Sequence, residues 1–308
     1  MGDSECFPVG SEASGLGWRR VLRNIAVECF ARQPVAVKLW EMKYFRRLIL
    51  GVLFRLETKT IVTVNAGPAG NRFRMCLRWQ AHMAYVLGLY EREIIGVLEE
   101  RLKTGDVCVD VGAHVGYLSM IMARLVGPQG RVISFEPVRE TYEALKENIQ
   151  LNGLNNVTIE PAAAGEADGF LELVCTKGEE LSWTASATGY SLPGEGRRIS
   201  VPVVSLDGYF AASALRPGLI KIDVEGAEAE VLRGARQTLR NIRPIVLVEI
   251  HDLGERHRKN VLELLEGCGY AVTGLGTRER EILCLALPFK GKEGPAGGLE
   301  TSLERNDH

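Results

Sequence analysis

The most constraining feature of this sequence is a short apolar run that ends in a glycine turn. Val107–Val111 is apolar except for Asp110, and Gly112 and Gly116 follow it directly. Beyond the glycines, apolar residues recur at helical spacing, namely Leu118, Ile121, Met122 and Leu125. The pattern predicts a buried strand, a tight turn and a helix. Such a turn lets a ligand approach the backbone, and the start of the helix offers it unpaired N–H groups.

A carboxylate follows the next apolar run. Arg131–Phe135 ends in Glu136 and Pro137, and Glu136 lies 24 residues after Gly112. At the tip of a neighbouring strand this carboxylate is placed to accept both hydroxyls of a ribose. His114 occupies the position of the second glycine in a dinucleotide fingerprint, so a pyrophosphate fits poorly. A nucleoside without phosphates, such as S-adenosylmethionine, fits better.

The rest of the chain alternates between predicted strands and helices. Strands are expected at 157–159, 218–222 and 245–250, with a continuous helix from Ala227 to Leu239. Two final strands, 270–274 and 282–287, are joined by a short polar turn and must be antiparallel. Residues 165–205 interrupt the alternation and are expected to form an insertion with strand-like pieces. The predicted fold is therefore α/β, a Rossmann-like class I methyltransferase sheet of seven mostly parallel strands with one antiparallel strand.

Ionisable residues follow the fourth and fifth strands of this sheet. They are Asp223, Glu225, Glu249 and His251. Because ligands in open α/β sheets bind beyond the carboxyl ends of the strands, we expect these catalytic candidates to converge. His251 is expected to titrate near neutrality and to take a proton, while Asp223 orients it or holds a metal. The alternative is that Asp223 or Glu225 simply caps the following helix.

Several tracts of the sequence, in this order, resemble the FkbM family of S-adenosylmethionine-dependent methyltransferases. They are Leu89-Tyr90-Glu91, Val109–Gly116, Phe135-Glu136-Pro137, Lys221–Glu228, Val231–Ala235 and Val248–His251. The resemblance covers about 85 to 252, and His114 stands where members often carry Asn. Together with the glycine turn it implies a cofactor site formed by Glu91, Asp110, Gly112, Ala113, His114, Gly116, Tyr117, Glu136 and Pro137.

The resemblance implies methylation of a hydroxyl on a sugar, glycan or secondary metabolite. An alcohol is a weak acid, so the transfer profits from a base or from a divalent metal that acidifies the hydroxyl. The sequence does not indicate a divalent metal, but it leaves one open. Two alternatives remain. One is a nicotinamide-dependent oxidoreductase on a similar sheet, and the other is a methyltransferase-like module that binds a nucleoside without turnover.

Composition and charge limit the remaining choices. The net charge of −2 does not favour nucleic acid as a partner. The seven cysteines are at least 16 residues apart, so neither a zinc pair nor a disulfide scaffold is expected. No secretory signal or membrane span is predicted, and the chain is expected to be cytoplasmic.

Three regions are expected along the chain. Residues 1–84 form a basic helical extension with a small hairpin, 85–288 a methyltransferase domain, and 289–308 a disordered tail. From 19 to 59 ten Lys or Arg face three Glu, a local charge of +7. A solvated helical face is favoured there over contact with a membrane surface or an acidic substrate.

Overall fold

The computed structural model describes residues 60–66, 71–77, 85, 90–177, 183–186, 196–278 and 281–289. The predicted basic segment, 19–59, lies outside the described residues, and so does the predicted tail after residue 289. None of the helices in the described ranges has the length and apolar character needed to cross a membrane.

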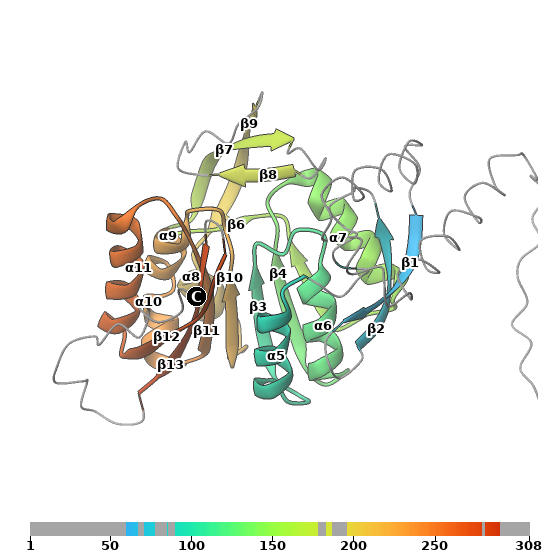
Figure 1. Cartoon of the computed structure of the whole chain (residues 1–308), viewed down its shortest axis with the longest axis horizontal. Helices are drawn as coiled ribbons and strands as arrows, with labels where there is room; N and C mark the ends of the chain where they lie inside the picture. The colour runs from blue at the N-terminus through green and yellow to red at the C-terminus, as the bar shows by residue number, and fades with distance from the viewer. Residues whose placement is uncertain are drawn as a thin grey trace, which may run out of the picture.

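A seven-stranded sheet forms the centre of the molecule, with the order β12-β13-β11-β10-β3-β4-β5 (Figure 1). β13 is antiparallel to both of its neighbours, and the other neighbouring pairs are parallel. This is the strand arrangement of class I methyltransferases, so the predicted fold is confirmed. The strands are β3 (Val107–Val111), β4 (Arg131–Phe135), β5 (Val157–Glu160), β10 (Leu219–Ile222), β11 (Ile245–His251), β12 (Tyr270–Arg278) and β13 (Glu281–Pro288).

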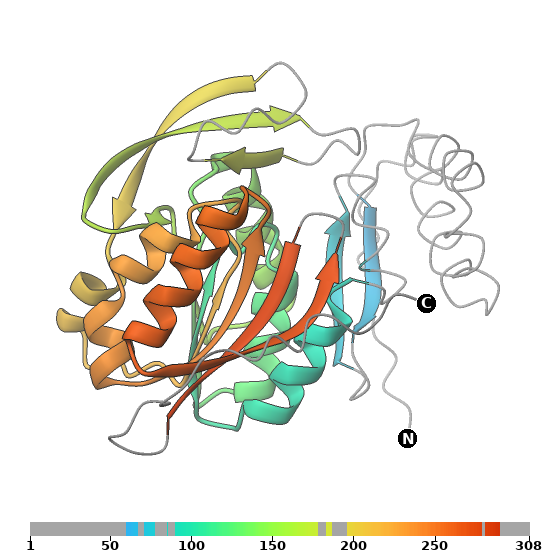
Figure 2. The same ribbon diagram turned by 60° about the vertical axis from the view of Figure 1, so that its left-hand side comes forward.

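Helices cover both faces of this sheet (Figures 1 and 2). Neighbouring strand residues point to opposite faces, so Cys108 and Val109 belong to two separate apolar cores. One core is shared with α5 (Arg92–Arg101), α6 (Tyr117–Val126) and α7 (Arg139–Leu151). The other is shared with α8 (Leu206–Ala211), α9 (Glu228–Arg233), α10 (Arg236–Asn241) and α11 (Glu255–Gly267).

The predicted continuous helix from Ala227 to Leu239 is wrong, because the chain forms two helices there, α9 and α10. Gly234 lies at the break, against the backbone of Gly165, where a Cβ atom would be 1.9 Å from the Gly165 carbonyl oxygen. Asp207 then caps the new helix, since its carboxylate accepts the N–H groups of Gln237 (2.9 Å) and Thr238 (2.7 Å). Close backbone packing and a distant cap therefore divide the helix.

The insertion at 165–205 forms a second sheet together with β6, which directly precedes it, and the strand order is β6-β9-β7-β8. Its strands are β6 (Ala163–Ala164), β7 (Gly169–Lys177), β8 (Trp183–Ser186) and β9 (Gly196–Val204). Leu173, Cys175 and Val201 pack from this sheet onto Val138, two residues after Glu136. The insertion thus continues the structure beyond the carboxyl edge of the central sheet, where α7 begins (Figure 1).

The predicted N-terminal hairpin is present as β1 (Thr60–Ala66) and β2 (Asn71–Leu77). It packs against α7, where the side chain of Asn148 accepts the N–H of Cys76 at 2.8 Å. Asn152 accepts the N–H of Arg74 (2.8 Å) and donates to its carbonyl (2.6 Å). Five described cysteines are buried: Cys76, Cys108, Cys175, Cys268 and Cys284.

Candidate functional site

The glycine turn brings the ends of β3 and β10 into contact. Gly112 has a φ of +80°, and a Cβ atom there would lie 1.8 Å from the carbonyl oxygen of Asp223. The N–H groups of Gly112 and Ala113 both donate to the carbonyl of Phe135 on β4, at 3.1 and 3.0 Å. The turn is thus fixed against both neighbouring strands, and only glycine permits this approach.

Glu136 lies beside this turn, buried at the end of β4. Its Oε2 accepts the N–H of His114 at 2.8 Å, and its Oε1 accepts the N–H of Val138 at 2.9 Å and the hydroxyl of Thr141 at 2.6 Å. Burial raises the pKa of the Glu136 carboxyl above its ordinary value, although these hydrogen bonds act in the opposite direction. The carboxylate is held rigidly at the strand tip that the sequence indicated.

Lys221 is a central residue that the sequence reasoning missed. Its Nζ lies 3.3 Å from Asp110 Oδ1, 3.4 Å from Asp223 Oδ2 and 3.1 Å from the Gly112 carbonyl oxygen. Burial alone would lower the pKa of this ammonium group, but the surrounding carboxylates raise it above its ordinary value. The signal in the sequence was a lone lysine inside the buried apolar strand Leu219–Ile222.

Several carboxyl groups surround the single ammonium group of Lys221. Those that raise its pKa belong to Asp110, Asp223, Glu249 and Glu91. Glu249 is buried on β11, and burial together with the nearby carboxylates of Asp223 and Glu91 raises its own pKa. Glu91 is buried immediately before α5, in a left-handed conformation with a φ of +51°. The site therefore has an excess of carboxyl groups around one buried cation.

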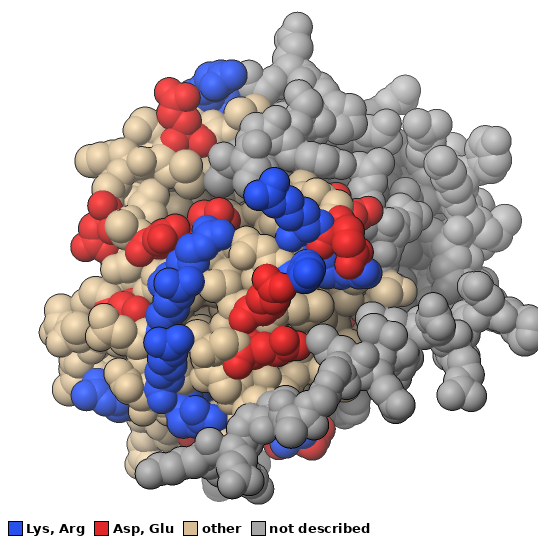
Figure 3. Space-filling view, turned by 90° about the vertical axis from the view of Figure 1, so that its left-hand side faces the viewer, with Lys and Arg blue, Asp and Glu red and all other residues tan. Residues whose placement is uncertain are grey.

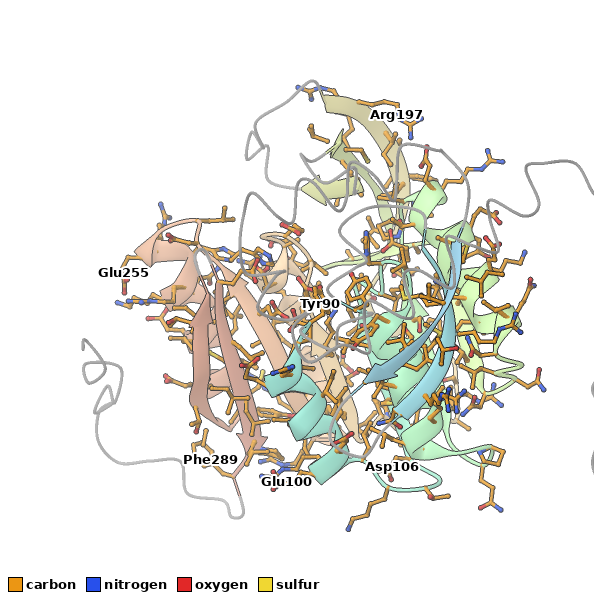
Figure 4. All side chains as sticks on the ribbon, turned by 45° about the vertical axis from the view of Figure 1, so that its right-hand side comes forward. Tyr90, Glu100, Asp106, Arg197, Glu255 and Phe289 are labelled. Atoms are coloured by element: carbon orange, nitrogen blue, oxygen red, sulfur yellow. The ribbon has the colours of Figure 1, made fainter. Side chains whose placement is uncertain are left out.

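Three tyrosine rings pack together beside these carboxyl groups. Tyr85 stacks on Tyr117 with ring centroids 4.6 Å apart, and Tyr90 meets Tyr85 edge to face at 4.4 Å. Figure 4 shows Tyr90 near the centre of the molecule, at the start of α5. The tyrosines line one pocket with Asp110, Gly112, Ala113, His114, Val115, Leu118, Lys221 and Asp223.

A second cluster lies around His251, at the end of β11. The Nε2 atom of His251 is 3.5 Å from Glu225 Oε2, 3.5 Å from Glu281 Oε1 and 3.8 Å from Asp223 Oδ1. Burial alone would lower the pKa of His251, but a hydrogen bond from its ring to Glu228 and the nearby carboxylates raise it to about 9. The expectation that His251 titrates near neutrality is therefore wrong, because carboxylates from several elements stabilise its charged form.

Glu225, in the same cluster, has a pKa closer to neutrality than that of His251. Burial and the neighbouring Asp223 carboxylate raise the pKa of Glu225 to about 7. Its backbone is left-handed, with a φ of +54°, which is uncommon for a residue other than glycine. Glu225 is thus the cluster member that changes charge near neutral pH. Within the described ranges, no group of His, Cys, Asp or Glu side chains has the arrangement of a metal site.

The structure brings most of the predicted site residues together. The pocket includes Asp110, Gly112, Ala113, His114 and Tyr117 from the predicted cofactor set, and Asp223 from the predicted catalytic set. Two other predicted residues do not line the pocket. Gly116 is the N-cap residue of α6, and Pro137 directly follows Glu136. The missed residues are Tyr85, Tyr90, Lys221, Glu228, His257 and Glu281. Their contacts come from elements far apart in sequence.

Comparison with known proteins gives a consistent result. Residues 110–272 match the family described as methyltransferase FkbM domain. The 31-O-demethyl-FK506 methyltransferase FkbM of Streptomyces tacrolimicus is 30% identical over 243 residues, which are 69% of this chain and 86% of that protein. The hexuronic acid methyltransferase AglP of Haloferax volcanii is 29% identical over 162 residues, covering 52% and 62% of the two chains. A crystal structure of methyltransferase FkbM from Methylobacillus flagellatus has 18% identity and a TM-score of 0.42, over 68% of this chain and 53% of that one.

Proposed function

Because this chain belongs to the FkbM methyltransferase family, we propose that it transfers a methyl group from S-adenosylmethionine to a hydroxyl group of a small or glycan-linked acceptor. The observation that carries the proposal is the pocket beside the glycine turn, where tyrosine rings and surplus carboxyl groups meet. When bound, S-adenosylmethionine supplies the methyl group on a sulfonium centre, whose sulfur keeps the electron pair of the broken carbon–sulfur bond.

The charge of the pocket suits a cationic ligand. Lys221 is the buried cation at its base, and Asp110 and Asp223 both lie within 3.4 Å of its ammonium nitrogen. The carboxyl group of Glu91, which also raises the pKa of Lys221, adds to the negative potential there. Aromatic faces attract alkylated cations through the ring quadrupole, so the tyrosines would favour a sulfonium over a neutral thioether.

Glu136 has hydrogen-bonding capacity left for a ribose. Its two oxygens offer about four acceptor sites, and the N–H groups of His114 and Val138 take one on each oxygen. The Thr141 hydroxyl is also 2.9 Å from the Val138 carbonyl, so its single proton can turn there and release Oε1. Each oxygen could then accept one ribose hydroxyl. The residues therefore fit the nucleoside.

A second buried group is available to a ligand. The hydroxyl of Tyr117 is buried and makes no hydrogen bond to any of the described residues. A buried hydroxyl without a partner is costly, and a polar group of the bound cofactor would satisfy it. Tyr117 therefore supports the same pocket as the cofactor site.

On the acceptor side, the proton of the attacking hydroxyl needs a base. Glu225, with its pKa of about 7, is suited to this role, because general bases work best with a pKa near the operating pH. Asp223 contacts Lys221 in the pocket beside the glycine turn and also lies 3.8 Å from His251 in the second cluster, so it stands between the two. We therefore assign to Asp223 the role of orienting the acceptor, and to Glu225 the role of taking the proton from its hydroxyl group.

The class of acceptor rests on the relatives. Their names refer to a 31-O-demethyl compound and to hexuronic acid, both of which point to hydroxylated molecules. The carboxylates around the His251 imidazole support a site that takes a proton from a hydroxyl group. We therefore propose an oxygen nucleophile on a sugar-like or macrocyclic acceptor.

Two measurements test the function. Thermal shift with S-adenosylmethionine, S-adenosylhomocysteine and NAD should show stabilisation by the first two ligands and none by NAD. Transfer of a labelled methyl group to D-glucuronic acid and to a macrolide with free hydroxyls should then yield a labelled product. Stabilisation by NAD alone would favour the oxidoreductase, and cofactor binding without transfer to any hydroxylated acceptor would favour the non-catalytic module.

A further inference from the structure

Glu228 is fully buried at the start of α9, although its side chain is a carboxylate. Its Oε1 accepts the N–H of Gly226 at 2.9 Å and lies 2.7 Å from Nδ1 of His251. Its Oε2 lies 2.8 Å from Nε2 of His257 on α11. One carboxylate therefore bridges two imidazoles from two different elements.

These contacts determine the protonation of the groups involved. Burial alone would raise the pKa of Glu228, but the hydrogen bonds from His251 and His257 lower it to about 2. Glu228 is therefore an acceptor at every physiological pH, and the ring nitrogen facing each of its oxygens must carry a proton. For His251 this fixes a proton on Nδ1.

At a pH above the Glu225 pKa of about 7, the other nitrogen of the His251 ring also faces only acceptors. Nε2 lies among the carboxylates of Glu225, Glu281 and Asp223, which belong to the loop after β10 and to β13. A neutral ring with its proton on Nδ1 would present a lone pair to three carboxylates, which is unfavourable. A second proton on Nε2 removes this repulsion and supplies a donor to them.

We propose that Glu228 is a positioning residue that keeps His251 as a fixed imidazolium, so that a carboxylate, Glu225, and not His251, takes the proton of the acceptor. The second half of this inference rests on the proposed function. The first half, the charge state of His251, depends only on the geometry of the cluster.

The arrangement has a clear use in catalysis. An imidazolium beside Glu225 stabilises its charged form and offsets the repulsion between Glu225 and Asp223, two carboxylates of one short loop. The cation also holds both carboxylates at the carboxyl edge of the sheet, beside the cofactor pocket. Without the charge of Glu228, His251 would lose its proton at lower pH, and Glu225 would lose the cation that lies 3.5 Å from its carboxylate.

The charge state can be measured directly by NMR on the full chain with isotopically labelled histidine. The signals of His251 are assigned by their loss in a His251→Gln variant. In the parent protein we expect imidazolium shifts up to pH 8 and a titration midpoint near 9. In Glu228→Gln, which keeps the shape of the side chain, the midpoint should move toward 6.5. Glu263→Gln is the matched control, because Glu263 is an exposed carboxylate on α11 that pairs with Lys259. It should leave the titration midpoint of His251 unchanged.

The same variants separate the two possible bases by activity. If Glu225 is the base, methyl transfer requires Glu225 charged and His251 protonated, so the pH profile is bell-shaped with limbs near 7 and 9. Glu228→Gln then narrows the bell from both sides and lowers transfer at pH 8 by about one decade or more. If His251 were the base, a single rising limb near 9 would instead move to lower pH in the variant, and the assignment of the proton to Glu225 would be overturned.

A midpoint below about 7.5 for His251 in the parent protein would overturn the inference, even if Glu228→Gln failed to fold. The NMR titration needs no acceptor and no turnover. An absence of methyl transfer with an intact high midpoint would therefore contradict the proposed function and leave the charge state of His251 supported.

Discussion

Lys221 on β10 and Asp110 on β3 stand opposite each other in the parallel register, and their charged groups are 3.3 Å apart. Both side chains are almost entirely buried, with exposed fractions of 3% and 1%. Asp110 is further held by the hydroxyl of Ser119 at 2.5 Å. Since Asp110 leads into the glycine turn and Lys221 leads to Asp223, this ion pair joins β3 to β10 at the edge of the pocket.

Replacing Lys221 by methionine should therefore destabilise the fold as well as the site. The variant leaves the buried carboxylate of Asp110 and the partly exposed carboxylate of Asp223 without their cation. Breaking a buried pair such as Lys221–Asp110 costs roughly 3–5 kcal/mol. Urea denaturation measures the loss. The exposed Lys259→Met on α11 serves as the control and should change stability by less than about 0.5 kcal/mol. A loss below about 1 kcal/mol for Lys221→Met would show that the pair contributes little.

Replacing Glu136 by alanine should weaken the affinity for S-adenosylmethionine by about one to two decades. The variant removes a charged acceptor for the ribose hydroxyls, a loss of roughly 1.5–3 kcal/mol. Titration calorimetry of the folded variant measures it, with Glu143→Ala on the exposed side of α7 as the control. Unchanged affinity in Glu136→Ala would show that the ribose does not bind at the end of β4.

The sheet and its functional edge could be predicted because their signals are local. A buried strand is a short apolar run, and Asp223 and His251 follow such runs directly. The parallel alternation then brings their ends to one edge. The same reasoning identified the glycine turn and Glu136, whose contacts lie within one strand-turn-helix unit and its neighbour.

The contacts that the sequence could not predict join elements far apart in the chain. Gly165 divides a helix by packing on Gly234, 69 positions later in the numbering. The high pKa of His251 arises from Glu228 and from carboxylates on separate elements, which no spacing rule connects. On the face that carries α11, by contrast, acidic and basic side chains are intermixed (Figure 3), as expected for a solvated helix.

The stability of the protein should fall as the pH rises from 6.5 to 9. The folded-state pKa of His251 is about 9 against an ordinary value of 6.5. The stability it contributes is thus fully present below 6.5 and is lost as the pH rises through 9. The shift corresponds to roughly 2–4 kcal/mol. Glu225, whose pKa is raised from 4.5 to about 7, acts in the same direction at lower pH.

Urea denaturation at pH 6.5 and at pH 9 measures this decline. In Glu228→Gln the decline should be smaller, because the variant removes the main partner of the imidazolium. The exposed Glu263→Gln variant should behave like the parent protein. An equal decline in Glu228→Gln would mean that groups other than His251 cause the pH dependence.

Replacing Gly112 by alanine should abolish cofactor binding, because the site needs β3 and β10 to meet without a side chain between them. The added Cβ would lie 1.8 Å from the Asp223 carbonyl oxygen, and the φ of +80° is unfavourable for alanine. Gly96→Ala in α5 is the matched control, since its Cβ meets nothing within 4 Å, and it should be neutral or stabilise by up to about 1 kcal/mol. Calorimetry with S-adenosylmethionine and urea denaturation on both variants give the comparison. Parent-like affinity in Gly112→Ala would show that the turn can open without loss of the pocket.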